Sequence, residues 1–223
     1  KAQDTGAEYP TALNNLSLAF LALAQRGIEP ETNLTRSVDA LKEASRFSKA
    51  QKDVPTYALV QANLGMAYLH EAQRGMATQQ NLHRAIESLT EAMSLFKDQD
   101  NWADYAVVLS NLGLTYQTAA EAGLEPKTNL VRSIDAFAEA AKLLMDQKNM
   151  AAYAIVQTSH GGALRILADY GWGTEESLGQ SVRMLLEAAD LLKLQSDEGN
   201  YAGAQNQIGM VFQALANRGI ESE

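Results

Sequence analysis

The stretch SNLGLTY (110–116) decides how the chain folds, because variants of it return along the sequence at a constant distance. The equivalent stretches are NNLSLAF (14–20), ANLGMAY (62–68), TSHGGAL (158–164) and NQIGMVF (206–212). Each begins 48 residues after the one before it. A fixed period of this size is typical of a repeat protein, in which each unit buries its apolar face against its neighbours.

Three further series of residues keep the same spacing without an insertion. They are Tyr9, Tyr57, Tyr105, Tyr153 and Tyr201; Gly27, Gly75, Gly123, Gly171 and Gly219; and Glu43, Glu91, Glu139 and Glu187. The period predicts one repeat domain over residues 1–223, with units at about 5–52, 53–100, 101–148 and 149–196 and a half unit over 197–223. Because the sequence starts without methionine and stops halfway through a unit, we expect it to be a fragment of a longer chain.

Each unit carries the patterns of two helices. In the second unit, apolar or small residues from Tyr57 to about Arg74 recur at the three-and-four spacing of an amphipathic helix. Gly75 suits the left-handed position that follows a helix, and a hydrophobic residue comes next, as in the Schellman motif. The hydrophobic residues at this place in the units are Ile28, Met76, Leu124, Trp172 and Ile220.

The second helix of each unit is predicted to begin at a residue that caps helix N-termini well. These predicted caps are Asn33, Asn81, Asn129 and Ser177. The helix continues through NLHRAIESLTEAMSLF (81–96), where apolar residues again form one stripe. The sequence therefore predicts an all-α protein, a right-handed superhelical α-solenoid of antiparallel helix pairs with about nine helices.

Composition limits the classes of function. Of the 223 residues, 46% are hydrophobic, and no apolar run is long enough to cross a membrane. The formal charge of -9 disfavours binding to nucleic acids or to anionic lipid surfaces. The chain has no cysteine, which excludes disulfides and thiolate chemistry. Without a signal peptide, we expect a cytoplasmic protein.

The pattern N-L-G-x-x-Y, followed by R/S-[AS]-[IV]-x-x-[LF]-x-E-A, resembles the tetratricopeptide repeat. The matching residues in the second unit are Leu64, Gly65, Tyr68, Ala85, Leu89 and Ala92. The unit is longer than the usual tetratricopeptide repeat of about 34 residues. It resembles the long units of kinesin light chains and of bacterial and archaeal NLGxxY arrays. The resemblance covers the whole chain, and it implies the fold far more strongly than it implies a partner.

In this family, a glycine of the first helix and a small residue early in the second helix allow the two helices to approach closely. The resemblance assigns this role to Gly65, Gly113, Gly161 and Gly209, together with Ala85, Ser133 and Ser181. Ser17 takes the place of the glycine in the first unit. We therefore expect packing to offset the roughly 1 kcal/mol that a helical glycine costs relative to alanine.

The resemblance also implies a concave groove lined by the first helices, in which asparagines hold the backbone of an extended peptide. Methionine would adapt the groove to varied side chains. The predicted groove residues are Asn15, Asn63, Asn111, Ser159, Gln207, Met66, His70, Gln117, Arg165 and Gln213. An alternative stays open, in which the asparagines only bridge adjacent helices.

Other polar residues of the repeat are better explained by contacts within the fold than by catalysis or ligand binding. Arginines recur seven residues before glutamates in three units, which favours a surface network of ion pairs between units; they are Arg36, Arg84 and Arg132. The tyrosines that open the first helices are expected to pack against the preceding second helix. The histidines His70, His83 and His160 have no metal-ligand spacing, and His160 replaces a leucine of the repeat.

These observations favour a protein-protein interaction module that binds a peptide or helical segment of a partner. We expect no cofactor and no enzymatic activity, because no acid-base pair, phosphate loop or nucleophile motif is present. The alternative is a scaffold that self-associates. The last helix suggests this alternative, because its apolar residues would lack a partner in this sequence; they are Ile208, Val211, Phe212 and Leu215.

Overall fold

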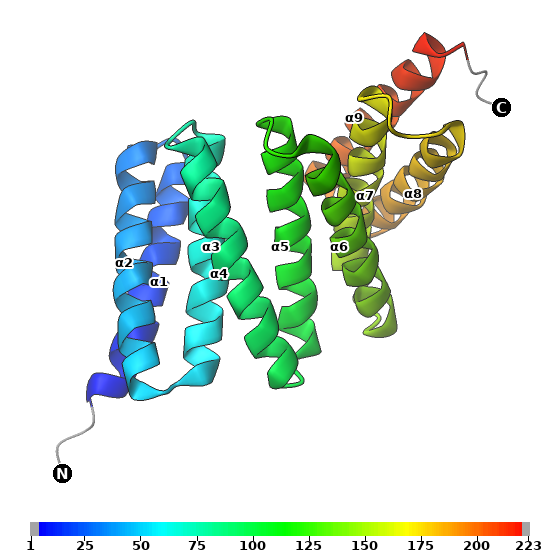
Figure 1. Ribbon diagram of the computed structural model, residues 1–223. Helices are drawn as coiled ribbons and strands as arrows, with labels where there is room; N and C mark the ends of the chain where they lie inside the picture. Colours follow the sequence, from blue (N-terminus) through cyan, green and yellow to red (C-terminus); the bar gives the residue numbers. More distant parts are fainter. Residues whose placement is uncertain (1–4, 220–223) are drawn as a thin grey trace. The chain divides into compact units, whose positions relative to one another are not determined.

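The computed structural model describes residues 5–219, which form nine α-helices and no strand (Figure 1). The predictions of an all-α protein and of about nine helices are confirmed for this part of the chain. The helices are α1 (Thr5–Gln25), α2 (Pro30–Gln51), α3 (Val54–Gln73), α4 (Thr78–Asp98), α5 (Trp102–Glu121), α6 (Pro126–Asp146), α7 (Met150–Asp169), α8 (Glu175–Leu194) and α9 (Glu198–Asn217).

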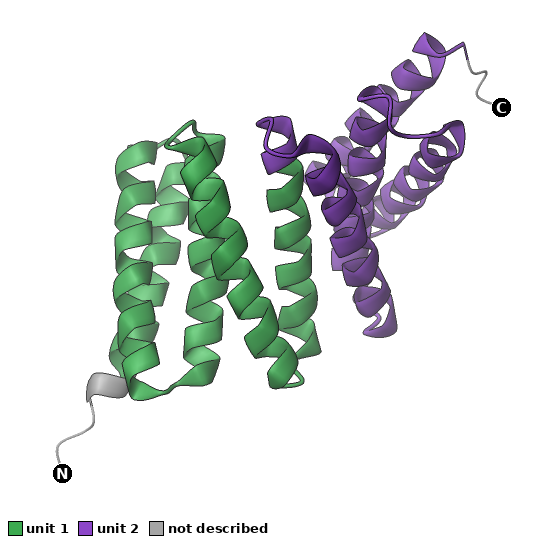
Figure 2. Cartoon of the chain, viewed as in Figure 1, with its two compact units in different colours: residues 1–118 green, residues 119–223 purple. Residues whose placement is uncertain are grey.

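The chain divides into two compact units, residues 1–118 and 119–223 (Figure 2). The division falls in the last turn of α5. In the first unit, α2 packs against both α1 and α3, and α3 packs against α4. In the second unit, α7 packs against both α6 and α8, and α9 packs against α8 and α7. Each helix of these series therefore buries its apolar side against its sequence neighbours.

The ends of the odd-numbered helices follow the predicted Schellman motif. Gly75 has a φ of 77°, and its N–H donates to Ala72 O (2.9 Å) while the N–H of Met76 donates to Glu71 O (2.9 Å). The same pair of bonds, with a positive φ at the glycine, closes α1, α5 and α7. The prediction is confirmed at these four ends. Ile220, the fifth hydrophobic residue of the series, lies outside the described residues.

The predicted starts of the even-numbered helices are wrong for the asparagines. Helix α4 begins three residues before Asn81, and α2 and α6 begin three residues before Asn33 and Asn129. These asparagines are buried inside the first turn, where each amide donates back to the carbonyl of the residue after the Schellman glycine. The distances are 2.8 Å to Ile28 O, 2.8 Å to Met76 O and 2.7 Å to Leu124 O. The asparagines thus fix the turn between two helices rather than cap a terminus.

The fourth even-numbered helix, α8, is capped by Thr174 instead of the predicted Ser177. Thr174 Oγ1 accepts from the backbone N–H of Ser177 at 3.2 Å. Helices α3, α5, α7 and α9 have caps that the sequence reasoning missed, again 48 residues apart. They are Asp53, Asn101, Asn149 and Asp197, and each accepts from the N–H three residues later.

The packing role of the helical glycines is confirmed in one pair of helices of each unit. An added Cβ at Gly65 would lie 2.5 Å from Leu89 Cγ and 3.1 Å from Ala85 O, so α3 and α4 meet closely here. At Gly161 it would lie 2.8 Å from Leu185 Cγ, and Ser181 Oγ donates to Gly161 O at 2.7 Å. At Gly209 no other described residue lies within 4 Å of an added Cβ, so no packing role is observed there.

Tyrosines at the start of the odd-numbered helices bind the helix that follows them. The hydroxyls of Tyr9, Tyr57 and Tyr153 donate to carboxylate oxygens of Glu43 (2.9 Å), Glu91 (2.7 Å) and Glu187 (3.2 Å). Tyr57 also contacts the preceding helix, because Lys49 Nζ donates to its hydroxyl at 3.2 Å. The predicted contact with the preceding helix is therefore confirmed at Tyr57, where it accompanies a second contact.

The predicted arginine-glutamate ion pairs are wrong in the first two repeats. Arg36 and Arg84 lie over the rings of Phe20 and Tyr68, with Cζ 5.9 and 5.6 Å from the ring centroids. The corresponding glutamates accept hydrogen bonds from the tyrosines described above. Both charged residues thus have aromatic partners on the preceding helix of their own repeat instead of ionic partners in the next one.

Candidate functional site

The exposed face of α3 forms a continuous stripe along the helix axis. Leu59, Asn63, Met66 and His70 follow one another at spacings of four, three and four residues, which places them on one side of the helix. Leu59 is 43% exposed, and the other three are half-buried. Of the predicted groove residues, this stripe brings together Asn63, Met66 and His70.

The apolar position at the start of the stripe was missed by the sequence reasoning. Val107 is 51% exposed and Ile155 is 40% exposed, and both occupy the position of Leu59 in their own helices. All three precede the asparagine or serine of the predicted ladder by one helical turn. The signal that could have identified them is their own 48-residue spacing together with the four-residue step to the ladder.

In the first unit, Asn63 bridges two helices. Its Nδ2 donates to Oδ1 of Asn14 in α1 at 2.8 Å, and Asn14 is buried. The predicted rung Asn15 is exposed beside it. The bridging alternative is therefore observed at Asn63, whose second amide hydrogen and carbonyl oxygen are not used by this bond.

Asn111 and Ser159 occupy the same position of α5 and α7 and are both half-buried. Ser159 Oγ donates to Ile155 O of its own helix at 3.3 Å, and the backbone carbonyl of Asn111 accepts from Thr115 Oγ1 at 2.7 Å. The side chain of Gln207 lies against α7, because a Cβ at Gly162 would be 3.2 Å from its Oε1. The ladder position is thus polar throughout, and it is half-buried at Asn63, Asn111, Ser159 and Gln207.

Three predicted groove residues lie on another side of their helices. Gln117, Arg165 and Gln213 follow the ladder position by six residues, which turns them about 120° around the helix. The same position holds the buried residues Leu21 and Leu69. Arg165 is half-buried and bound to Asp169 one turn later in α7. We therefore leave these three residues out of the proposed site.

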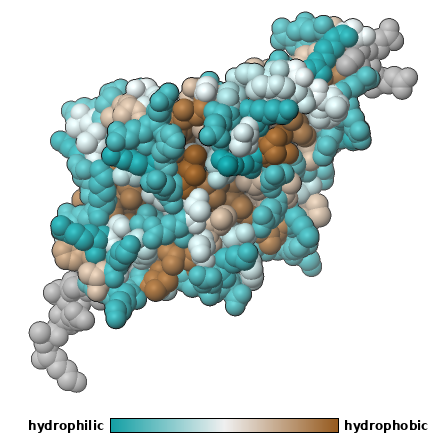
Figure 3. Space-filling model, viewed as in Figure 1, coloured by the Kyte–Doolittle hydropathy of each residue, from teal (hydrophilic) through white to brown (hydrophobic). Residues whose placement is uncertain are grey.

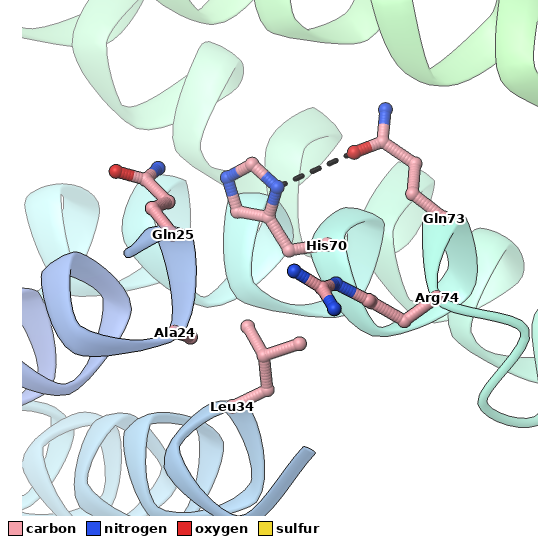
Figure 4. A pocket seen from close by; sticks show the side chains of 6 residues that line it. All are labelled: Ala24, Gln25, Leu34, His70, Gln73 and Arg74. Atoms are coloured by element: carbon pink, nitrogen blue, oxygen red, sulfur yellow. Dashed lines mark hydrogen bonds between the residues drawn. The ribbon is translucent and has the colours of Figure 1, made fainter. Parts of the chain in front are cut away.

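The stripe of α3 ends at an open pocket of about 290 Å³ in the first unit (Figure 4). Side chains from α1, α2, α3 and the residue that follows α3 line it; they are Ala24, Gln25, Leu34, His70, Gln73 and Arg74. His70 Nδ1 lies 3.3 Å from Gln73 Oε1, and the guanidinium of Arg74 lies below the imidazole ring (Figure 4). The pocket combines an apolar wall with two amides and one permanent positive charge.

Burial lowers the pKa of His70, and the charge of Arg74 lowers it further, against the opposing hydrogen bond to Gln73. The imidazole is therefore neutral at pH 7 and can either donate or accept a hydrogen bond. The positive charge of the pocket then comes from Arg74 alone among its lining residues. The lining can therefore donate and accept hydrogen bonds and presents one positive charge to a polar or anionic group.

The remaining histidines lie apart from the stripe. His160 is buried in α7, and burial lowers its pKa while the charge of Asp135 opposes the change. His83 is exposed on α4, with Nδ1 2.8 Å from Gln79 O. Within residues 5–219, no three metal-ligating side chains come together, and no helix has the length and apolarity needed to cross a membrane.

The surface of the molecule mixes apolar and hydrophilic side chains. Figure 3 shows one face of the molecule, on which apolar side chains lie in separate areas between larger hydrophilic ones. No protein-family model and no curated protein matches this sequence, so comparison with known proteins assigns the chain to no family. The site is therefore judged from its own chemistry and from the repetition of its positions within the chain.

Proposed function

We propose that this protein is a protein-protein interaction module that binds an extended peptide or a helical segment of a partner along the stripe of α3 in the first unit. The proposal includes a tetratricopeptide-like architecture, a right-handed superhelical solenoid of antiparallel helix pairs. The 48-residue period, the Leu-Gly-x-x-Tyr pattern and the close packing at Gly65 and Gly161 support this architecture. The proposal assigns the chain no reaction and no cofactor.

The observation that carries the proposal is the repeated exposure of Leu59, Val107 and Ile155. An exposed apolar side chain is ordinary when it stands alone, but three at one repeat position form a pattern. Each lies one turn from a half-buried polar group of the ladder. A peptide could place apolar side chains on the first position and its backbone amides on the second.

Asn63 is the best placed ladder residue for this role. Its bond to Asn14 fixes the amide in position, which lowers the entropy lost when a peptide binds. Met66 follows it on the stripe and can adapt to different apolar side chains. Bridging and binding are then two uses of one side chain.

The test is selection of peptides from a displayed random-sequence library on the wild-type protein, followed by titration of the selected peptides. Leu59→Ser should weaken their binding at least tenfold. Val131→Ser is the matched control, because Val131 in α6 is equally exposed but lies on an even-numbered helix. If no peptide is selected, or if both variants bind equally well, the proposed site is wrong.

A self-associating scaffold is the second candidate, and its remaining support in α9 is the exposed Phe212. Phe212 of this helix is 39% exposed, whereas Ile208, Val211 and Leu215 are buried and pack in one cluster with α7 and α8. The apolar face expected to lack a partner is therefore already covered, except at Phe212. Sedimentation at several protein concentrations tests this candidate, and a monomer at all of them would exclude it.

A further inference from the structure

The pocket at the end of the α3 stripe has an equivalent place in the second unit, two periods of 48 residues further along the chain. The residues that correspond there to Ala24, Leu34 and His70 are buried together in one apolar cluster; they are Ala120, Leu130 and Ile166. In the first unit the half-buried imidazole of His70 stands at the position of Ile166, and the place is an open pocket. The same scaffold of alanine and leucine thus supports a packed core in one unit and a cavity in the other.

The other lining residues give the two places opposite charges. Gln25 and Gln73 of the pocket correspond to two carboxylates of the second unit, and Arg74 corresponds to a tyrosine; they are Glu121, Asp169 and Tyr170. The lining of the pocket therefore holds one cation and no carboxylate, although the whole chain has a formal charge of -9. A local excess of positive charge of this kind attracts an anion.

The charge of Arg74 is available to a ligand. No carboxylate among residues 5–219 forms an ion pair with it, since the ion pairs of this part of the chain join other side chains. Its guanidinium lies below the ring of His70, inside the pocket (Figure 4). A guanidinium donates hydrogen bonds in a planar fork that matches a carboxylate or a phosphate.

The helix ends around the pocket oppose an anion only weakly. Helices α1 and α3 both end here, and a helix C-terminus carries a partial negative charge. The Schellman bonds occupy carbonyls of these last turns, because Ala24 O accepts from the N–H of Gly27 at 3.0 Å and Ala72 O accepts from that of Gly75 at 2.9 Å. Among the lining residues, the full charge of Arg74 therefore dominates.

We propose that this pocket binds a small organic anion, in which a carboxylate or phosphate group is attached to a compact apolar body. The anionic group contacts Arg74 and the side-chain amides, and the body lies against Ala24 and Leu34. The volume of about 290 Å³ is at the lower limit of small-molecule sites, so a ligand with about one ring fits. The pocket shares His70 with the stripe, but the anion binds without a peptide, so each proposal can fail without the other.

The probe is benzoate, titrated at constant ionic strength into the ¹⁵N-labelled 223-residue chain. The backbone N–H signals of Gln25 and Gln73 are followed by NMR, and we expect them to shift to saturation, with a dissociation constant in about the millimolar range. Benzamide has the same shape without the charge and should bind at least tenfold more weakly. Phenyl phosphate distinguishes the two anionic groups, because the tighter of it and benzoate carries the group that the pocket prefers.

Arg74→Gln should weaken benzoate at least tenfold. Arg26→Gln is the matched control, because Arg26 is the exposed equivalent of Arg74 at the end of α1 and does not line the pocket. His70→Ile introduces the isoleucine of the second unit and should also abolish binding by filling the cavity. Circular dichroism of the three variants shows whether they keep their helices.

Three results would each overturn the proposal. The first is the absence of a saturable shift with benzoate and with phenyl phosphate. The second is equal binding of benzoate and benzamide, which would show that the pocket does not recognise the charge. The third is equal binding of benzoate by Arg74→Gln and Arg26→Gln, which would place the anion elsewhere on the protein.

Discussion

Helices α7 and α9 belong to the same unit and carry the same small residues at the same repeat positions, yet their surroundings are opposite. Gly161 lies under Leu185, with Ser181 bound to its carbonyl, whereas Gly209 has no described neighbour within 4 Å of an added Cβ. The side chain of Tyr153 binds a carboxylate, and that of Tyr201 binds none among residues 5–219. The comparison shows that a residue's position in the repeat does not set its energetic role, which depends on whether a helix covers it.

The largest expected effect is that of Gly161→Ala. Its new Cβ would lie 2.8 Å from Leu185 Cγ, so the two helices must move apart or Leu185 must leave its favoured rotamer. Overpacking of this kind costs about 1 to 3 kcal/mol, which outweighs the roughly 1 kcal/mol of helix propensity gained. The midpoint of urea unfolding should fall. A midpoint that stays the same or rises would show that α7 and α8 are not in close contact.

His160→Leu tests another difference, since the equivalent residue in α9 is Ile208. The pKa of His160 is lowered from its ordinary value of 6.5 mainly by burial. Below pH 6.5 the unfolded chain binds a proton that the folded chain does not, so stability falls as the pH falls towards the lowered pKa. For one proton the loss is at most about 1.4 kcal/mol per pH unit.

His160→Leu should therefore flatten the decline of the urea midpoint between about pH 7.5 and pH 5.5, where most carboxylates stay charged. His83→Gln, at an exposed position of α4, is the control and should leave the decline unchanged. An equal slope in the wild type and in His160→Leu would show that this imidazole is not desolvated in the folded protein.

Tyr153→Phe and Tyr201→Phe compare the two tyrosines that open α7 and α9. Tyr153 donates to Glu187 and accepts from the buried Gln157 at 2.9 Å, so removal of its hydroxyl should cost about 1 kcal/mol of unfolding free energy. Tyr201→Phe removes only an exposed bond and should change it by much less. Thermal unfolding of both variants measures the difference. Equal losses would show that the contact with the following helix adds no stability.

The smallest effect is expected for Gly209→Ala in the free chain, and its sign is opposite to that of Gly161→Ala. The new methyl group meets no described atom within 4 Å, so the variant gains helix propensity without a clash. The gain is at most about 1 kcal/mol, visible as a small rise in the urea midpoint. Destabilisation would indicate that the face of α9 is already covered in the free protein.

Much of the fold could be predicted from local sequence. Gly75 and Met76 predict the end of a helix because only the last turn and the next two residues decide a Schellman motif. The start of α4 was misplaced because the amide of Asn81, which could serve as a cap, donates to the preceding turn instead. Two local partners compete for the same side chain, and the sequence pattern does not rank them.

The site was less predictable than the fold. The repeat predicts the ladder position, but it does not indicate that Leu59 is exposed, because an apolar residue on a helix is expected to be buried. Arg165 was placed in the groove although its position is filled by buried leucines in the first two repeats. Which side of a helix remains exposed depends on its neighbours, and these are known only once the helices are packed.

The sequence by itself determined the repeat, the all-helical class and the ends of the odd-numbered helices, because a 48-residue period and local hydrogen-bonding motifs specify them. Only the tertiary structure decided the partners of side chains that can bind in several ways. In that structure Asn63 donates a hydrogen bond to Asn14, and Tyr57 donates one to the helix that follows it. Gly209 has no described atom within 4 Å of an added Cβ. The physical reason is that burial and pairing are properties of two helices in contact, whereas a sequence motif describes one helix at a time.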